Sequence, residues 1–270
     1  MSVANTLRFL LSAGWRTRNG AGLSGCPRRK GFDYESAYED LARRLPRDQA
    51  IGGGRNGGWY ELGGLIELSV LEMEGLQPTH TLVDFGCGNG RLAVKVIPKL
   101  SGGTYIGIDI SETMLREAEQ LVRKAIPQPP CSVQWNKQNT PAFALAAGSV
   151  DMMCAFSVFT HLEHEDTFRY LAEARRVIKP QGRFLFSCLP IRLAEAQVIF
   201  RHQASLDLRT RWRGVRNVVT TVEMMDAIAR MAGWRTLKWY PADKACIRVP
   251  PSGEYTALGQ EICVLEPSES

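Results

Sequence analysis

The sequence predicts an α/β protein in which a mostly parallel sheet carries helices on both faces. Over residues 65–190, apolar strand patterns alternate with segments whose apolar residues recur at helical spacing. Strands that are separated by helices pair in parallel through right-handed crossovers. The predicted strands are apolar nearly throughout, as expected when helices cover both faces. No linker interrupts the chain, so we expect one domain over residues 65–270, with a leader at 1–64 and an insertion at 191–218.

The elements follow in order from this alternation. Strands are predicted over residues 81–85, 104–110, 132–135, 150–156 and 183–189. Helices are predicted over residues 65–76 and 90–100, then behind Ser111 as an N-cap, and over a segment that includes 168–178. The arginine-rich insertion reads as helical, and a helix over Thr221–Gly233 with strands at "TLKWY" and "EICVLEP" completes the domain.

The leader has two unlike halves. Met1–Phe32 is basic and has no acidic residue, which is typical of an amphipathic helix on the protein body or of an organelle transit peptide. We therefore expect a cytoplasmic protein, with the mitochondrial matrix as the alternative. A helix is predicted near Ser36–Arg44. The following "IGGGRNGGWYELGG" (residues 51–64) is rich enough in glycine to predict a mobile loop that serves as a lid.

Composition excludes several classes of protein. Of 270 residues, 44% are apolar and 23% charged, as in ordinary soluble globular proteins. No stretch approaches the roughly 20 apolar residues that a membrane-spanning helix needs. The seven cysteines are odd in number and lack a CxxC pair, which indicates reduced thiols. The four histidines do not combine with cysteines at zinc-site spacing, so no metal is expected.

Three glycines alternate with other residues directly after the first strand, in the run "DFGCGNG" (Asp84–Gly90). Glycines let a turn adopt positive φ and let a ligand approach bare backbone. Ligands of open α/β sheets bind at the carboxyl ends of the strands. Asp109 ends the second strand nineteen residues after Gly90, a spacing that suits a carboxylate bound to the hydroxyls of an adenosine ribose.

The run predicts a nucleoside site but not a dinucleotide site. The dinucleotide fingerprint is G-x-G-x-x-G, whereas this chain has G-x-G-x-G with Asp84 two residues before the first glycine. An acid so close would repel a pyrophosphate and would suit a cationic ligand that carries an amino group and a sulfonium.

The motifs occur in an order that resembles a known family. "VDFGCGNGRLA", "YIGIDISETML", "SVDMMCAFSVFTHL" and "EARRVIKPQGRFLFS" are similar to the successive motifs of class I S-adenosylmethionine-dependent methyltransferases. The resemblance covers residues 65–190 and, less specifically, the tail. It implies a Rossmann-like seven-stranded sheet in the order 3-2-1-4-5-7-6, with strand 7 antiparallel, and S-adenosylmethionine as the cofactor.

The resemblance also implies roles for individual residues. Asp109 would bind the ribose, Ile110 and Met114 would lie beside the adenine, and Gln138 or Asn139 would meet its amino group. Phe156 and Ser157 would border the methyl group. The methionine part would be cradled by Asp84, Gly86, Cys87, Gly88 and Gly90.

Methyl transfer to an oxygen or nitrogen that starts protonated needs a base or a hydrogen-bond acceptor. His161 follows the fourth strand and is the candidate base, because an ordinary histidine titrates near pH 6.5. The alternative is a loop histidine that is hydrogen-bonded to backbone and has no catalytic role. His164 competes for the role of base. Trp59 and Tyr60 could close over the substrate, and Arg201 with the other insertion arginines could hold a substrate carboxylate or phosphate, or simply form a solvated helix face.

The leading hypothesis is a methyltransferase that acts on a small-molecule acceptor. The alternatives are a nucleic-acid or protein methyltransferase that docks through its basic segments, a non-catalytic binder of S-adenosylmethionine, and a nicotinamide dehydrogenase. Nucleic acid is disfavoured because no aromatic residues of the stacking type interleave with the arginines. No pattern in the sequence specifies an oligomeric state.

Overall fold

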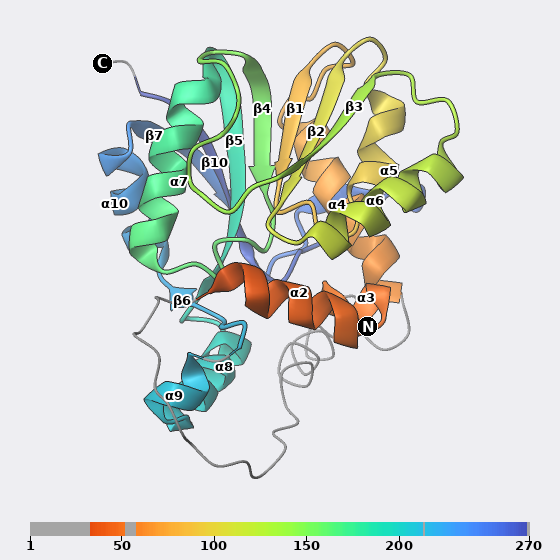
Figure 1. Ribbon diagram of the computed structural model, residues 1–270. Coiled ribbons are helices and arrows are strands. Elements are labelled where there is room, and N and C mark those ends of the chain that lie inside the picture. The colour runs from red at the N-terminus through yellow and green to blue at the C-terminus, as the bar shows by residue number, and fades with distance from the viewer. Residues whose placement is uncertain (1–32, 52–57, 213, 269–270) are drawn as a thin grey trace.

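The computed structural model describes residues 33–51, 58–212 and 214–268. Its centre is a twisted sheet in which five parallel strands are followed by an antiparallel pairing at one side (Figure 1). The strands are β1 (Thr81–Phe85), β2 (Thr104–Asp109), β3 (Ser132–Lys137), β4 (Val150–Ala155), β5 (Ile178–Pro190), β7 (Trp234–Tyr240) and β10 (Glu261–Pro267). Their order is β3-β2-β1-β4-β5-β10-β7, which confirms the predicted topology with its last strand antiparallel between β5 and β7.

Helices cover both faces because successive strand residues point to opposite sides. On one side, Leu82 and Tyr105 pack with α4 (Gly58–Met73), α5 (Ala93–Val96), the short 3₁₀ helix η1 (Ile97–Lys99) and α6 (Glu112–Ala125). On the other side, Val83 and Ile106 pack with α7 (His164–Val177) and α10 (Val222–Met231). Ser111 caps α6 as predicted, because its Oγ accepts from the Met114 N–H at 3.1 Å.

Two groups of helices lie at the edge to which the parallel strands point (Figure 1). They are α2 (Tyr34–Arg44) with α3 (Arg47–Ala50), and the insertion helices α8 (Ala194–Ser205) and α9 (Leu208–Arg211). After the insertion, β6 (Val219–Thr220) pairs in parallel with the end of β5. A small hairpin of β8 (Ile247–Val249) and β9 (Glu254–Thr256) packs on the α4 side through Ile247 and Val249. Among the described helices, none is long and apolar enough to cross a bilayer.

The prediction of a glycine-rich lid is wrong over its second half. Residues 52–57 lie outside the described residues, and α4 begins at Gly58 and includes Gly63 and Gly64. A Cβ atom at Gly64 would lie 2.8 Å from the Arg91 carbonyl oxygen. Glycine is therefore needed here because α4 packs closely against the segment after β1. It does not indicate a moving loop. The element that covers the sheet edge is α2.

The basic half of the leader, Met1–Phe32, also lies outside the described residues, so its two interpretations stay predictions.

Candidate functional site

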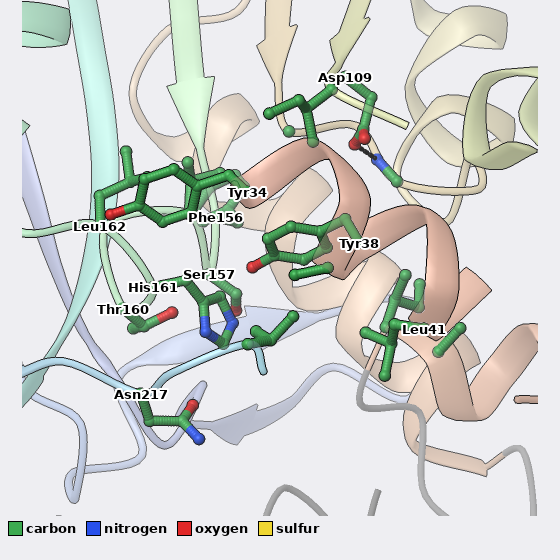
Figure 2. A pocket seen from close by; sticks show the side chains of 18 of the residues that line it. Tyr34, Tyr38, Leu41, Asp109, Phe156, Ser157, Thr160, His161, Leu162 and Asn217 are labelled. Atoms are coloured by element: carbon green, nitrogen blue, oxygen red, sulfur yellow. Dashed lines mark hydrogen bonds between the residues drawn. The ribbon is translucent and has the colours of Figure 1, made fainter. Parts of the chain in front are cut away.

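A cavity of about 900 Å³ runs along the carboxyl edge of the sheet. Its walls come from the turn after β1, the ends of β2 and β4, helix α2 and the insertion (Figure 2). The order of the strands reverses between β1 and β4, and ligands of open α/β sheets bind at such a switch point. Most of the predicted site residues therefore meet in one place, although they come from distant parts of the chain.

The glycine turn adopts the positive φ that its spacing predicts, with values of 75° at Gly86, 53° at Gly88 and 88° at Gly90. Gly86 and Gly88 line the cavity, but Gly90 does not. A Cβ at Gly86 would lie 2.3 Å from a methyl carbon of Val158, and one at Gly90 would lie 3.1 Å from the Ala118 Cα. Part of the requirement for glycine is thus packing inside the protein, in addition to the positive φ and the ligand approach that the sequence pattern predicted.

Asp109 lies at the end of β2 and is 8% exposed. Its carboxylate accepts from the Gly88 N–H at 2.8 Å and from the Ser111 N–H at 2.9 Å. Burial raises the pKa of Asp109 to about 6, although the backbone donors act in the opposite direction. The carboxylate thus holds the glycine turn and also lines the cavity, where its remaining lone pairs can accept from the hydroxyls of a sugar.

Asp84 is buried directly beneath the turn. Its carboxylate accepts from the Tyr105 hydroxyl at 2.7 Å and from the Cys154 thiol at 3.6 Å. Burial raises the pKa of Asp84 to about 7; Tyr105 lowers it, and the negative charge of Glu67 raises it further. Asp84 therefore holds a carboxylate that water stabilises poorly and that a cation in the cavity would stabilise.

The raised pKa of Asp84 predicts a pH dependence of stability. A carboxyl whose pKa rises on folding binds protons more tightly in the folded state, so its contribution falls as pH rises from about 4 to about 7. Asp84→Asn should flatten this part of the curve, while Glu72→Gln at the exposed Lys99 pair should not. Urea unfolding at several pH values measures it, and parallel curves for Asp84→Asn and the wild type would contradict the raised pKa.

The predicted adenine residues also line the cavity: Ile110, Met114, Gln138 and Asn139. The Gln138 amide donates to the Thr140 carbonyl oxygen at 2.8 Å. The Asn139 amide donates to Glu35 of α2 at 3.1 Å. This half of the cavity is thus closed by a contact between the β3 end and α2.

At the end of β4, Phe156 and Ser157 line the cavity as predicted. Ser157 has a φ of 59°, which is rare for a residue other than glycine. The Ser157 N–H donates to the Ser187 hydroxyl at 2.7 Å. The Ser157 hydroxyl accepts from the Gln260 amide at 3.0 Å. Sequence reasoning missed Gln260, which lies far along the chain and reaches the site only because β10 inserts beside β5.

His161 lines the cavity next to Tyr38 of α2, with the two ring centroids 6.0 Å apart (Figure 2). Its Nδ1 lies 2.6 Å from the Arg216 carbonyl oxygen. A carbonyl oxygen can only accept, so Nδ1 carries the hydrogen and Nε2 is left with the lone pair. Burial lowers the pKa of His161 below its ordinary value, and the bond to Arg216 offsets part of this effect. At neutral pH the ring is therefore an uncharged base.

The insertion holds the Arg216 carbonyl oxygen in place. The Val218 N–H donates to the Thr160 carbonyl oxygen at 2.7 Å, directly beside His161. The Arg216 guanidinium pairs with Glu163 and lies 4.3 Å from the centre of the Trp212 ring. These contacts fix the returning backbone of the insertion against the loop after β4.

Three other predicted substrate residues do not line the cavity. The Tyr60 hydroxyl donates to Asn89 at 3.2 Å, and His164 contacts the Thr220 hydroxyl at 3.0 Å at the start of α7. Arg201 is exposed and donates to Gln197 in its own helix at 3.4 Å. Trp59 does line the cavity.

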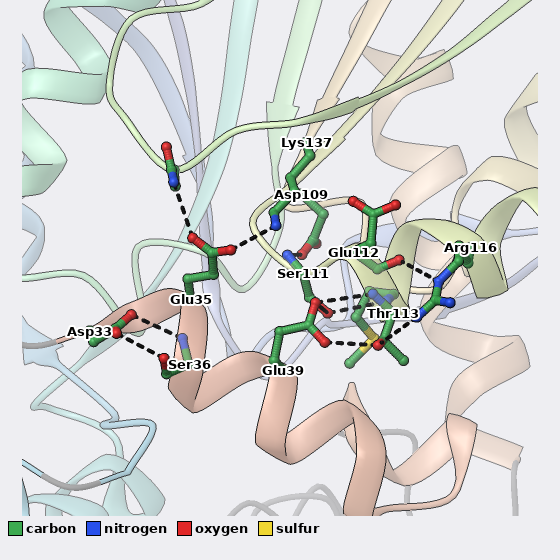
Figure 3. Close-up of polar contacts among 12 residues, drawn as sticks. Asp33, Glu35, Ser36, Glu39, Asp109, Ser111, Glu112, Thr113, Arg116 and Lys137 are labelled. Carbon is green, nitrogen blue, oxygen red and sulfur yellow. Dashed lines mark hydrogen bonds and ion pairs between the residues drawn. The ribbon is translucent and has the colours of Figure 1, made fainter.

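Helix α2 is attached to the cavity wall through Glu39 (Figure 3). Its carboxylate accepts from the Ser111 hydroxyl at 3.1 Å and from the Thr113 N–H and hydroxyl at 3.1 and 2.8 Å. Burial alone would raise the pKa of Glu39, but these donors outweigh it and hold the pKa below the ordinary value. Glu35 adds an ion pair with Lys137 at 2.7 Å. The acid of α2 thus binds the N-terminus of α6, where a negative charge is favourable.

Glu39→Ala should loosen α2, because Thr113 loses the acceptor of two hydrogen bonds worth about 1 kcal/mol each. Hydrogen exchange of the α2 amides should become faster, while exchange in the central strands stays slow. Glu72→Ala, a surface carboxylate far from α2, provides the control. Equal α2 protection in both variants would show that α2 is held by other contacts.

The comparisons agree with this geometry. Residues 82–182 match the family described as "Methyltransferase domain". This segment is therefore similar to methyltransferase domains, and it covers 101 of the 270 residues of the chain. The matched segment begins in β1 and ends in β5, so it contains the glycine turn, Asp109 and His161.

Curated relatives of the methyltransferase domain act on different molecules. A 2-phytyl-1,4-naphtoquinone methyltransferase of Trichormus variabilis is 28% identical over 128 residues, which cover 46% of this chain and 54% of that protein. A trans-aconitate 2-methyltransferase of an Azoarcus species is 34% identical over 107 residues, which cover 40% and 38%. The chain thus spans about half or less of the length of these relatives.

Solved structures share the fold of the methyltransferase domain. A magnesium protoporphyrin IX methyltransferase of Synechocystis with bound S-adenosylhomocysteine is 16% identical with a TM-score of 0.58, covering 83% of this chain and 89% of that one. A structure of the same enzyme with bound S-adenosylmethionine gives a TM-score of 0.60 at 16% identity, covering 89% of this chain and 100% of that one.

The residues present fit S-adenosylmethionine, the cofactor of this domain. Asp84 and Asp109 line the cavity, and neither is in an ion pair with a described cationic side chain. A cavity wall with two such carboxylates suits a ligand that carries positive charge and a ribose. Asp109 would hold the ribose, the backbone at Gly86 and Gly88 the methionine part, and the pocket of Ile110 and Met114 the adenine. Among the described residues, no group of acids, histidines and cysteines could hold a metal ion.

Proposed function

We propose that this protein transfers a methyl group from S-adenosylmethionine to an oxygen or nitrogen of a small-molecule acceptor. The observation that carries the proposal is that one cavity is lined both by the carboxylates Asp84 and Asp109, expected at the cofactor, and by the uncharged imidazole of His161. Bound S-adenosylmethionine supplies a methyl group that its sulfonium already activates for in-line displacement. The protein then has to position the acceptor and to remove its proton.

In this proposal His161 takes the proton of the acceptor at Nε2. Nδ1 keeps its hydrogen because the Arg216 carbonyl oxygen holds it, so the imidazolium that forms stays hydrogen-bonded. Tyr34 and Tyr38 of α2 and Phe156 supply flat apolar surface beside His161 (Figure 2). Such surface excludes water and orients a small organic acceptor.

Two features favour a small acceptor. The cavity has walls from the sheet edge, α2 and the insertion, so three parts of the chain surround the space for the acceptor. The named relatives include enzymes for a quinone and for trans-aconitate, which are small molecules. A malonyl-[acyl-carrier protein] O-methyltransferase of Geobacter sulfurreducens, 29% identical over 120 residues that cover 42% of that protein, acts on a carrier-linked group.

The proposal is tested first by binding and then by turnover. Calorimetry with S-adenosylhomocysteine should show binding, and NAD should neither bind nor raise the melting temperature. Incubation of a metabolite extract with labelled S-adenosylmethionine should then yield a labelled small molecule. Binding without any labelled product would favour a non-catalytic binder, and no binding would reject the assignment. Labelling of nucleic acid or protein, with a steep dependence on salt, would favour the docking alternative.

A further inference from the structure

Most of the charged side chains that line the cavity form ion pairs with each other, and a few do not. Three pairs neutralise each other: Arg44 with Asp40, Arg91 with Glu67, and Arg169 with Asp166. Apart from histidines, what remains is Asp84 and Asp109 in the cofactor half and Arg211 of α9 in the insertion half. Arg211 donates to the Leu206 carbonyl oxygen at 3.1 Å, and no described carboxylate pairs with it. The cavity therefore has an acidic half and a basic half.

The cavity wall also contains polar atoms that have no hydrogen-bond partner. Among the described residues of the cavity wall, Thr160 Oγ1, Gln203 Oε1 and Arg211 Nε are buried without a hydrogen-bond partner. Thr160 is only 2% exposed, and Figure 2 shows its hydroxyl beside His161. A buried polar group without a partner costs about 1–3 kcal/mol, so several of them in one cavity wall indicate a polar ligand.

All three groups can donate to an anion. The hydroxyl of Thr160 and the guanidinium of Arg211 are donors. The amide of Gln203 can present its nitrogen in place of its oxygen, because a flip of the amide exchanges the two. They come from three elements, namely the loop after β4, α8 and α9. Their shared property is that each would gain a partner from a negatively charged oxygen.

We propose that the acceptor carries a carboxylate, which Arg211, Thr160 and Gln203 anchor at the insertion end of the cavity. This inference rests on the proposed methyl transfer and names the class of acceptor for it. A guanidinium matches the two oxygens of a planar carboxylate, and one unpaired arginine balances one negative charge. A phosphate ester near neutral pH would bring up to two charges against the one unpaired arginine of the described cavity wall.

The methyl group is not transferred to the anchored carboxylate but to another group of the acceptor. His161 stands beside Thr160 and serves an acceptor atom that must lose a proton, such as a hydroxyl or an amine. The acceptor therefore carries two functional groups, an anion at Arg211 and a protonated oxygen or nitrogen near His161. The charges are then complementary along the whole cavity. The cationic methyl donor lies near Asp84 and Asp109, and the anionic group of the acceptor lies near Arg211.

Calorimetry on the full chain saturated with S-adenosylhomocysteine tests this anchor, with benzoate, benzamide and phenyl phosphate as ligands. Benzoate should bind about tenfold more tightly than its neutral isostere benzamide, as expected for a charge-assisted hydrogen bond. Phenyl phosphate should bind more weakly than benzoate. Arg211→Gln should remove the preference for benzoate. Arg209→Gln, on the exposed side of the same short helix and outside the cavity wall, should keep it.

Three results would overturn the anchor: equal affinity for benzoate and benzamide or no binding of either, tighter binding of phenyl phosphate, or a benzoate preference that survives Arg211→Gln. The titration with S-adenosylhomocysteine that precedes each run separates this inference from the proposed function. Binding of S-adenosylhomocysteine without a carboxylate preference rejects the anchor alone. Absence of S-adenosylhomocysteine binding rejects the proposed function and the anchor with it.

Discussion

His161→Ala should lower kcat by about 10²-fold or more, while the dissociation constant of S-adenosylhomocysteine stays unchanged. The reason is the arrangement around the ring, in which the Arg216 carbonyl oxygen binds Nδ1 at 2.6 Å and leaves Nε2 as the proton acceptor. The measurement is turnover at saturating cofactor and acceptor, together with calorimetry. His164→Ala is the matched control, because His164 contacts Thr220 and does not line the cavity.

The pH profile separates a base from a structural histidine. Burial lowers the pKa of His161 below its ordinary value of about 6.5. If this base controls the rate, the wild-type kcat/KM should rise with pH in the acid range and should already be constant by about pH 6.5. His161→Ala should lose that part of the profile. Turnover that survives the substitution, or an unchanged profile, would assign His161 to holding the returning backbone of the insertion.

Asp109→Ala should weaken the binding of S-adenosylhomocysteine by about 1.5–3 kcal/mol, the range for a hydrogen-bonding group that carries charge. The carboxylate lines the cavity at the end of β2 and faces the place where a ribose would lie. Calorimetry at one pH well above 6 measures the effect, since the pKa of Asp109 is raised to about 6 and the group must be ionised in the wild type.

A second variant distinguishes ribose binding from damage to the glycine turn. Asp109 also accepts from Gly88 and Ser111, so alanine leaves two backbone donors without an acceptor. Asp109→Asn keeps an oxygen for one of these two donors but loses the charge. If Asn restores the melting temperature and not the affinity, the carboxylate binds the ligand directly. Unchanged affinity in both variants would reject the ribose assignment.

Periodicity and turn chemistry predicted most of the sheet and half of the site. The strands, their order, the cap at Ser111 and the meeting of Asp84, Asp109 and His161 at one edge follow from local patterns and from the rules of parallel sheets. These features depend on residues close in sequence or on a topology with few alternatives. The start of α4 at Gly58 was missed, because three glycines there indicate a loop until the packing against Arg91 is known.

The rest of the site depends on how distant segments meet. Gln260 reaches Ser157 only through the insertion of β10 into the sheet, and Glu39 finds Thr113 only once α2 lies across the edge. The choice among the insertion arginines is similar. Arg201 and Arg211 look alike in sequence, but one is exposed and the other lines the cavity, since the relative placement of α8 and α9 decides which side chain faces inward.

The partner of His161 in the insertion is a main-chain oxygen, and this has an evolutionary consequence. Any amino acid that keeps the local backbone conformation can supply a carbonyl oxygen at position 216. If His161 removes the proton as proposed, side chains across the insertion can change and select new acceptors while this step is retained. A single scaffold of this kind can diversify in what it modifies while the chemical step is inherited intact.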